Sequence, residues 1–127
     1  MANVNSIQQQ PNTEHDATID VRSPRSGVAQ VVLGGEHDLS SASQLRETLD
    51  QALANCSHLI VDVSPVQFID ATTINVLVNA QQAATERDCR FNLVLSTTPL
   101  VERVLEITGV LEALDRVHSL EQALQVS

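Results

Sequence analysis

The sequence predicts an α/β fold, a mixed and mostly parallel sheet with helices packed mainly on one face. Two observations support this prediction. Short apolar runs, typical of buried strands, alternate along the chain with longer stretches whose apolar residues recur at helical spacing. Strands that alternate with helices usually lie parallel and are joined by right-handed crossovers. The expected order along the chain is ββαβαβαβα.

The first two predicted strands form an antiparallel hairpin. Residues 17–22 alternate apolar and polar side chains, which is typical of a strand with one buried face. Residues 23–27 contain Ser, Pro and Gly, which favour a turn. Residues 28–33 are more apolar and form the second strand, which we expect to end at Gly34-Gly35.

The next two helices each begin at a predicted capping residue. Ser41, with Gln44 three residues later, forms a capping box at the start of the first helix. Between the helices, residues 58–63 form an apolar run that suits a central parallel strand. Asp70 caps the second helix, which runs to about Glu86. The predicted inward face of both helices contains Ala42, Leu45, Leu49, Ala52, Leu53, Ile74, Leu77 and Val78.

The last part of the chain continues the alternation. Residues 90–95 form a fourth strand in this scheme. Residues 98–109 form a third helix, because a Thr-Pro pair starts the segment and a glycine ends it. Residues 115–118 form a short final strand. Residues 119–124 open with a Ser-x-x-Gln capping box and form the C-terminal helix.

Length and polarity define one domain with a tail. At 127 residues the chain has the size of a single domain. Residues 1–16 are polar, so we expect a disordered tail before a domain over residues 17–126. The sequence contains neither an apolar run near the ~20 residues that span a bilayer nor the pattern of a secretory signal. We therefore expect a cytoplasmic protein.

The composition excludes several classes of partner. The net charge is -9, and all seven basic residues are arginine. An acidic surface repels nucleic-acid phosphates and anionic lipids, so we expect neither nucleic acid nor a membrane as a partner. The negative charge favours solubility, and it would also complement a basic patch on a protein partner.

Motifs for catalysis and for cofactors are missing from the sequence. It contains no glycine-rich phosphate loop and no Gly-x-Ser-x-Gly elbow. Its four histidines do not lie at metal-ligand spacing with one another or with a cysteine. We therefore expect no enzyme activity, no cofactor and no bound metal.

The two cysteines occupy corresponding positions. Cys56 and Cys89 each precede a predicted strand, so both should lie at the same edge of a parallel sheet. They are either small apolar fillers near helix ends or a redox pair. In a cytosolic protein we expect both to be reduced.

Three segments carry the information about function. In residues 62–77 a strand ends, a short loop crosses, and a helix opens with Asp-Ala-Thr-Thr. Residues 34–39 read Gly-Gly-Glu-His-Asp-Leu, and residues 104–110 read Val-Leu-Glu-Ile-Thr-Gly-Val. In this order and spacing, the segments resemble the STAS family, the domain of anti-sigma factor antagonists and of sulphate-transporter tails. The resemblance covers about residues 17–126, and it fits the stand-alone antagonist branch better than the transporter tails.

The resemblance implies a function in bacterial transcription regulation by partner switching. Such a domain binds an anti-sigma factor, commonly a serine kinase of the GHKL ATPase type, and thereby frees a sigma factor. Phosphorylation of a serine at the start of the second helix ends the antagonism in the family. The residues that would line or flank the partner surface here are Asp38, Ser41, Asp70, Ala71, Thr72 and Thr73.

At the family's phosphoserine position this sequence has Ala71, which has no hydroxyl to phosphorylate. Thr72 is the alternative acceptor, although it points about 100° further around the helix. Thr72 and Thr73 are equally ordinary residues for a helix start. Two alternatives therefore stay open: a phosphorylation-insensitive STAS scaffold or decoy within a signalling complex, and a small-molecule-sensing STAS domain. The sequence does not decide the oligomeric state, a homodimer included.

Overall fold

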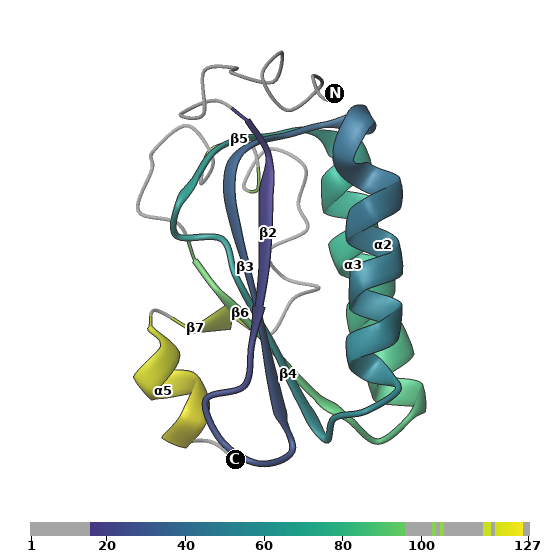
Figure 1. Cartoon of the computed structure of the whole chain (residues 1–127), viewed down its shortest axis with the longest axis vertical. Coiled ribbons are helices and arrows are strands. Elements are labelled where there is room, and N and C mark those ends of the chain that lie inside the picture. The colour runs from purple at the N-terminus through teal and green to yellow at the C-terminus, as the bar shows by residue number, and fades with distance from the viewer. Residues whose placement is uncertain (1–15, 96–102, 104, 106–115, 118, 126–127) are drawn as a thin grey trace, which may run out of the picture.

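The computed structural model describes residues 16–95, 103, 105, 116–117 and 119–125, and the predicted tail at residues 1–16 lies almost wholly outside this part (Figure 1). The described elements are β2 (Thr18–Arg22), β3 (Val28–His37), α2 (Leu39–Leu53), β4 (His58–Asp62), β5 (Val66–Ile69), α3 (Ala71–Glu86), β6 (Arg90–Val94), β7 (Arg116–Val117) and α5 (Leu120–Gln125). Figure 1 shows the sheet between two layers, with α2 and α3 on one side and α5 on the other.

The sheet confirms the predicted mixed, mostly parallel arrangement. Its strand order is β2-β3-β4-β6-β7, and β5 adds to the far end of β3. Among the described strands only β2 runs antiparallel, pairing with β3 in the predicted hairpin. The pairs β3–β4, β4–β6, β6–β7 and β3–β5 are parallel.

The larger core lies under α2 and α3. These helices contact each other and cover one face of the sheet, where nearly all the predicted inward residues are buried. The other face holds a smaller apolar cluster that includes Ile60, Val94 and Ala123, beneath α5. Because most apolar area is buried under the first two helices, the prediction that helices pack mainly on one face is confirmed.

The glycine pair does not end the second strand, so that prediction is wrong. β3 continues through Gly34 and Gly35 as far as His37, with a shift of register between Gly35 and Glu36. Gly35 has a φ of +74°, and a Cβ built on it would lie 1.9 Å from the carbonyl oxygen of Asp16. Glycine is therefore needed here to let the strand kink and continue rather than to stop it.

The first helix begins earlier than predicted. Asp38 is its N-cap and accepts a hydrogen bond from the amide of Ser40, whereas Ser41 lies inside the first turn. The short strand β5 was not predicted at all. It pairs with the part of β3 that follows Gly34. The missed strand and the misplaced end of β3 therefore have the same cause.

Other caps agree with the sequence. Oδ1 of Asp70 accepts a 3.0 Å hydrogen bond from the amide of Thr73, which confirms Asp70 as the N-cap of α3. Oγ of Ser119 accepts a 3.1 Å bond from the amide of Gln122 at the start of α5. Most of the predicted third helix, at residues 98–109, lies outside the described residues.

Candidate functional site

The candidate site forms where two parallel strands end side by side. His37 of β3 is the register partner of Ile69 of β5, and each strand is followed at once by a helix. The amide of Asp70 donates a 3.2 Å hydrogen bond to the carbonyl oxygen of His37. The two N-caps, Asp38 and Asp70, therefore lie next to each other, at the point where the ends of the two strands are hydrogen-bonded. Figure 1 shows α2 and α3 starting at the same end of the sheet.

Asp38 supplies an exposed negative charge at this junction. One of its carboxylate oxygens accepts hydrogen bonds from the amide of Ser40 at 2.9 Å and from the hydroxyl of Ser40 at 2.6 Å. These bonds hold the pKa of Asp38 below its ordinary value, because they stabilise the ionised carboxylate. The group is therefore charged at neutral pH and faces solvent.

The start of α3 continues the same surface. Asp70 is half-buried, Ala71 is exposed, and Thr72 is half-buried in the first turn of the helix. Ala71 thus presents only a methyl group at the helix start. The free amides of the first turn favour an anionic group near this position.

Two of the predicted site residues lie beneath the surface. Ser41 is 7% exposed, and its hydroxyl lies 3.1 Å from Nδ1 of the buried His37. Thr73 is fully buried, and its Oγ1 has no hydrogen-bond partner. Neither hydroxyl can touch a docked protein without a rearrangement, so both can only support the surface from below.

His37 connects this junction to the edge strand. Its Nε2 lies 3.1 Å from the carbonyl oxygen of Thr18, on β2. Burial lowers the pKa of His37 below its ordinary value, although the hydrogen bond to Thr18 opposes the shift. The ring is therefore neutral at pH 7, and its Nε2 donates to the carbonyl oxygen of Thr18. Nδ1 faces the hydroxyl of Ser41, which also lies 3.2 Å from the carbonyl oxygen of Asp38.

Two exposed apolar residues beside the caps were missed by the sequence reasoning. Leu39 is 73% exposed at the first position of α2, and Phe68 is 38% exposed on β5, two residues before Asp70. The exposure of both side chains depends on tertiary packing, so no local sequence pattern identifies them. We call the surface formed by Asp38, Leu39, Asp70, Ala71 and Thr72 the helix-start ledge.

The ledge combines the carboxylates of Asp38 and Asp70 with an exposed leucine, Leu39. Among the residues described, no group of three or more His, Cys, Asp or Glu could hold a metal ion. No helix in the described part of the chain is long and apolar enough to cross a membrane.

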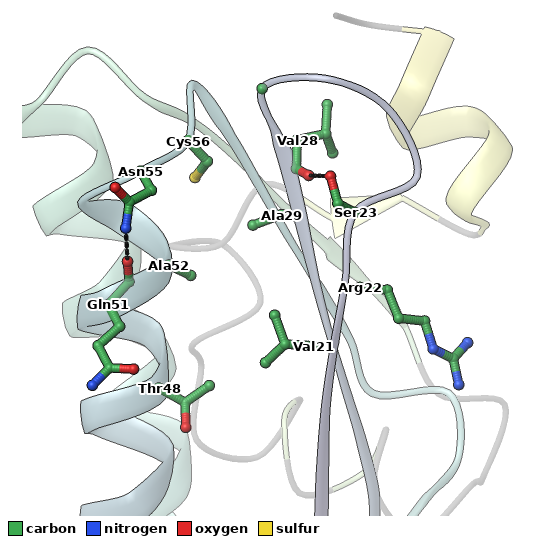
Figure 2. A pocket seen from close by; sticks show the side chains of 11 residues that line it. Val21, Arg22, Ser23, Val28, Ala29, Thr48, Gln51, Ala52, Asn55 and Cys56 are labelled. Carbon is green, nitrogen blue, oxygen red and sulfur yellow. Dashed lines mark hydrogen bonds between the residues drawn. The ribbon is translucent and has the colours of Figure 1, made fainter.

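A separate groove lies at the other end of α2. It has a volume of about 420 Å³ and runs between the C-terminal half of α2 and the β2–β3 hairpin. Figure 2 shows Val21, Ala29, Ala52 and Cys56 around it, with Arg22 pointing away. Mixed apolar and amide side chains line the groove, including Thr48, Gln51 and Asn55.

The chain belongs to the STAS domain family. A family model described as "Mlab, STAS domain" matches residues 19–125, almost the whole predicted domain. Among the curated proteins no relative matches.

Solved structures share this fold at low sequence identity. An anti-sigma factor antagonist from Mycobacterium paratuberculosis is 24% identical over 87% of this chain and 93% of its own, with a TM-score of 0.74. The Bacillus cell fate determinant SpoIIAA in its phosphorylated form is 15% identical over 85% of this chain and 97% of its own, with a TM-score of 0.64. A sulfate transporter family protein from Wolinella succinogenes is 22% identical over 83% of this chain and 88% of its own, with a TM-score of 0.68.

Proposed function

We propose that this domain is an anti-sigma factor antagonist, a cytoplasmic protein that binds an anti-sigma factor and so regulates sigma-factor-dependent transcription. The helix-start ledge is the docking surface in this proposal. The partner is an anti-sigma factor of the serine/threonine kinase type with a GHKL ATPase fold. The domain itself performs no catalysis, because its part is to occupy the partner.

The observation that carries the proposal is the composition of the ledge. Asp38 is exposed and ionised, and next to it Leu39 is 73% exposed at the first position of α2. Apolar side chains at the centre of a contact, with charges at its rim, are typical of transient protein interfaces. A carboxylate on this rim would attract a basic patch on the partner and set its orientation.

Similarity to known antagonists supports the same assignment. Two structural relatives with this fold are described as anti-sigma factor antagonists, and SpoIIAA is recorded both with and without phosphate. The sulfate transporter relative shows that the fold also occurs in another class of protein. The exposed ledge therefore carries more weight than the fold in the choice between them.

Phosphorylation, where it occurs, falls on Thr72 in this proposal. Ala71 cannot form a phosphoester, and the hydroxyl of Thr73 is buried. Thr72 is half-buried in the first helical turn, where free amides tolerate an added phosphate. The phosphate would place nearly two charges inside the docked contact, and the cost of desolvating them would release the partner.

A second candidate follows from the same alanine. If Thr72 is not modified, the domain is a STAS scaffold or decoy that holds its partner without being switched. The methyl group of Ala71 at an exposed helix start is the observation that favours this candidate. A third candidate, a small-molecule sensor, is favoured by the 420 Å³ groove between α2 and the hairpin.

Binding measurements with matched variants test the leading proposal. The purified chain is titrated by calorimetry against each GHKL-type anti-sigma factor encoded in the same genome. The variant Leu39→Asp should weaken binding at least about tenfold, because a charge replaces an apolar contact. Val21→Asp is the control, because Val21 is also an exposed apolar residue, 55% exposed, but lies on β2 away from the ledge.

Three outcomes separate the candidates. Loss of binding in Leu39→Asp but not in Val21→Asp supports the docking ledge. Equal binding by both variants, or no binding to any such anti-sigma factor by the parent chain, contradicts it. Binding that persists unchanged after incubation with ATP favours the scaffold over the switched antagonist.

A further inference from the structure

The two cysteines face each other within the fold. Sγ of Cys56 lies 3.8 Å from Sγ of Cys89, although the residues are 33 positions apart in the sequence. Cys56 follows the end of α2 and Cys89 follows the end of α3. Both thiols are free in this structure.

The backbone already holds these two segments together. The amide of Arg90, next to Cys89, donates a 2.9 Å hydrogen bond to the carbonyl oxygen of Ser57, next to Cys56. A disulfide needs its sulfurs at about 2.05 Å, so the thiols must approach by less than about 2 Å.

The two thiols differ in access. Cys89 is 7% exposed, and its S–H donates to the carbonyl oxygen of Arg90 at 3.5 Å. Cys56 is only half-buried, and Figure 2 shows it at the wall of the groove beside α2. A small solute that enters the groove therefore meets Cys56 first and reaches Cys89 only behind it.

We propose that Cys56 and Cys89 form a reversible disulfide when the protein meets a peroxide oxidant. In the first step Sγ of Cys56 attacks hydrogen peroxide. The O–O bond breaks, the sulfur gains a hydroxyl group, and one water leaves. In the second step Sγ of Cys89 attacks Sγ of Cys56. The S–O bond breaks, the S–S bond forms, and the second water leaves with the thiol proton.

The electrons balance with no further reactant. The two thiols together lose two electrons, and hydrogen peroxide gains them to become two waters. A cellular dithiol can return both electrons, so the bond is reversible, as disulfides in reducing compartments usually are. In this scheme Cys56 is the peroxide-reactive thiol and Cys89 is the resolving thiol.

The environment of Cys89 keeps this thiol from reacting first. Burial, together with the charge and hydrogen bond of Cys56, raises the pKa of Cys89 to about 11. Cys89 is therefore protonated and unreactive toward external oxidants at neutral pH. Cys89 gives up its proton only in the resolving step, where the proton leaves with the hydroxyl group of Cys56 as water.

Mass spectrometry of the purified full chain tests the proposal directly. After treatment with hydrogen peroxide under non-reducing conditions, the intact protein should lose the mass of two hydrogen atoms, and dithiothreitol should restore it. Trypsin cleaves after Arg46, Arg87 and Arg90, so peptides 47–87 and 88–90 should then appear joined. Free cysteine at the same peroxide concentration calibrates the reactivity.

Single-thiol variants test the order of the two steps. Cys89→Ala should accumulate a sulfenic acid on Cys56 that dimedone traps. In Cys56→Ala, Cys89 should react with hydrogen peroxide at least about tenfold more slowly than Cys56 does in Cys89→Ala, because Cys89 is buried and protonated. Thermal unfolding of both reduced variants checks that each is folded.

The proposal would be overturned by any of three results. These are cross-linking between two chains in place of the intramolecular bond, oxidation of Cys56 to sulfinic acid with no joined peptides, and Cys89 reacting as fast as Cys56. All of these measurements use the isolated chain, so they do not depend on the docking function proposed above.

Discussion

The amide of Asp70 donates a 3.2 Å hydrogen bond to the carbonyl oxygen of His37, and this bond joins the ends of two neighbouring strands. Each strand continues directly into a helix, so the caps of α2 and α3 come together through the backbone alone. The carboxylates of Asp38 and Asp70 thus serve two purposes. Each stabilises its own helix, and the exposed part of each contributes charge to the ledge.

The capping role of Asp70 predicts a measurable loss of stability. Asp70→Ala should lower the free energy of unfolding by about 1 kcal/mol, because the amide of Thr73 loses its 3.0 Å acceptor. Asp70→Asn keeps an oxygen in place and should retain most of this free energy. Urea unfolding monitored by circular dichroism measures both.

The comparison of the two variants also separates charge from capping. If Asp70→Asn keeps its stability but binds the partner more weakly, the carboxylate charge acts in docking. An equal loss of stability in both variants would contradict the capping assignment.

The kink at Gly35 predicts a larger effect. Gly35→Ala should destabilise the protein by at least about 1–2 kcal/mol, since alanine is strained at a positive φ. A Cβ at this position would also lie 1.9 Å from the carbonyl oxygen of Asp16. Thermal unfolding measures the loss.

Gly34→Ala provides the matched control for the kink. Its Cβ would lie 2.7 Å from Oγ1 of Thr18, the end of a side chain that can rotate, and at an ordinary contact distance of 3.7 Å from Cβ of Pro65. The control should therefore cost clearly less stability. A Gly35→Ala protein as stable as the parent would show that the register shift does not need glycine.

The fold was predictable because its main strands and helices have strong periodic patterns. The apolar runs of β3, β4 and β6 and the helical spacing in α2 and α3 each identify their element without tertiary information. The antiparallel hairpin followed from the turn at residues 23–27. The C-terminal half of β3 could not be predicted, because a glycine pair in sequence does not distinguish a kink from an end.

That single ambiguity also explains the errors at the site. Once β3 was taken to end at Gly34-Gly35, β5 had no strand to pair with, and the helix start appeared to be Ser41. The structure selects Asp38 because β3 runs to His37 and the helix must begin at once. Asp70 was predicted correctly, although Thr72 and Thr73 beside it also favour a helix start. The exposure of Leu39 depends on tertiary packing, so no local pattern could reveal it.

Two buried histidines predict how stability depends on pH. Burial lowers the pKa of both His37 and His58 below the ordinary value of 6.5. Nε2 of His58 lies 2.7 Å from Oδ1 of Asn92, while its Nδ1 is buried without a partner. Below pH 6.5 the unfolded chain therefore binds more protons than the folded one, and the free energy of unfolding falls as the pH decreases.

Urea unfolding between pH 7.5 and pH 5 measures this slope. Stability should be constant above about pH 7 and should decline below 6.5, until the folded-state pKa values are reached. His58→Gln should lower the absolute stability but flatten the decline, because one of the two titrating groups is removed. An unchanged slope in this variant would show that the pKa of His58 is the same in the folded and the unfolded chain.

The final prediction concerns the alanine at the start of α3. Ala71→Ser places a hydroxyl at an exposed position where first-turn amides favour a phosphate. A GHKL-type kinase that binds the parent chain should phosphorylate the introduced serine, and the added charge of nearly -2 should weaken binding at least about tenfold. Phosphopeptide mapping and calorimetry measure the two effects.

The same substitution in a Thr72→Val background removes the competing acceptor. If the parent chain is phosphorylated to the same extent, and at Thr72, then the switch has moved by one residue and the alanine has not abolished it. If the introduced serine is phosphorylated and binding is unchanged, the start of α3 lies outside the docking surface.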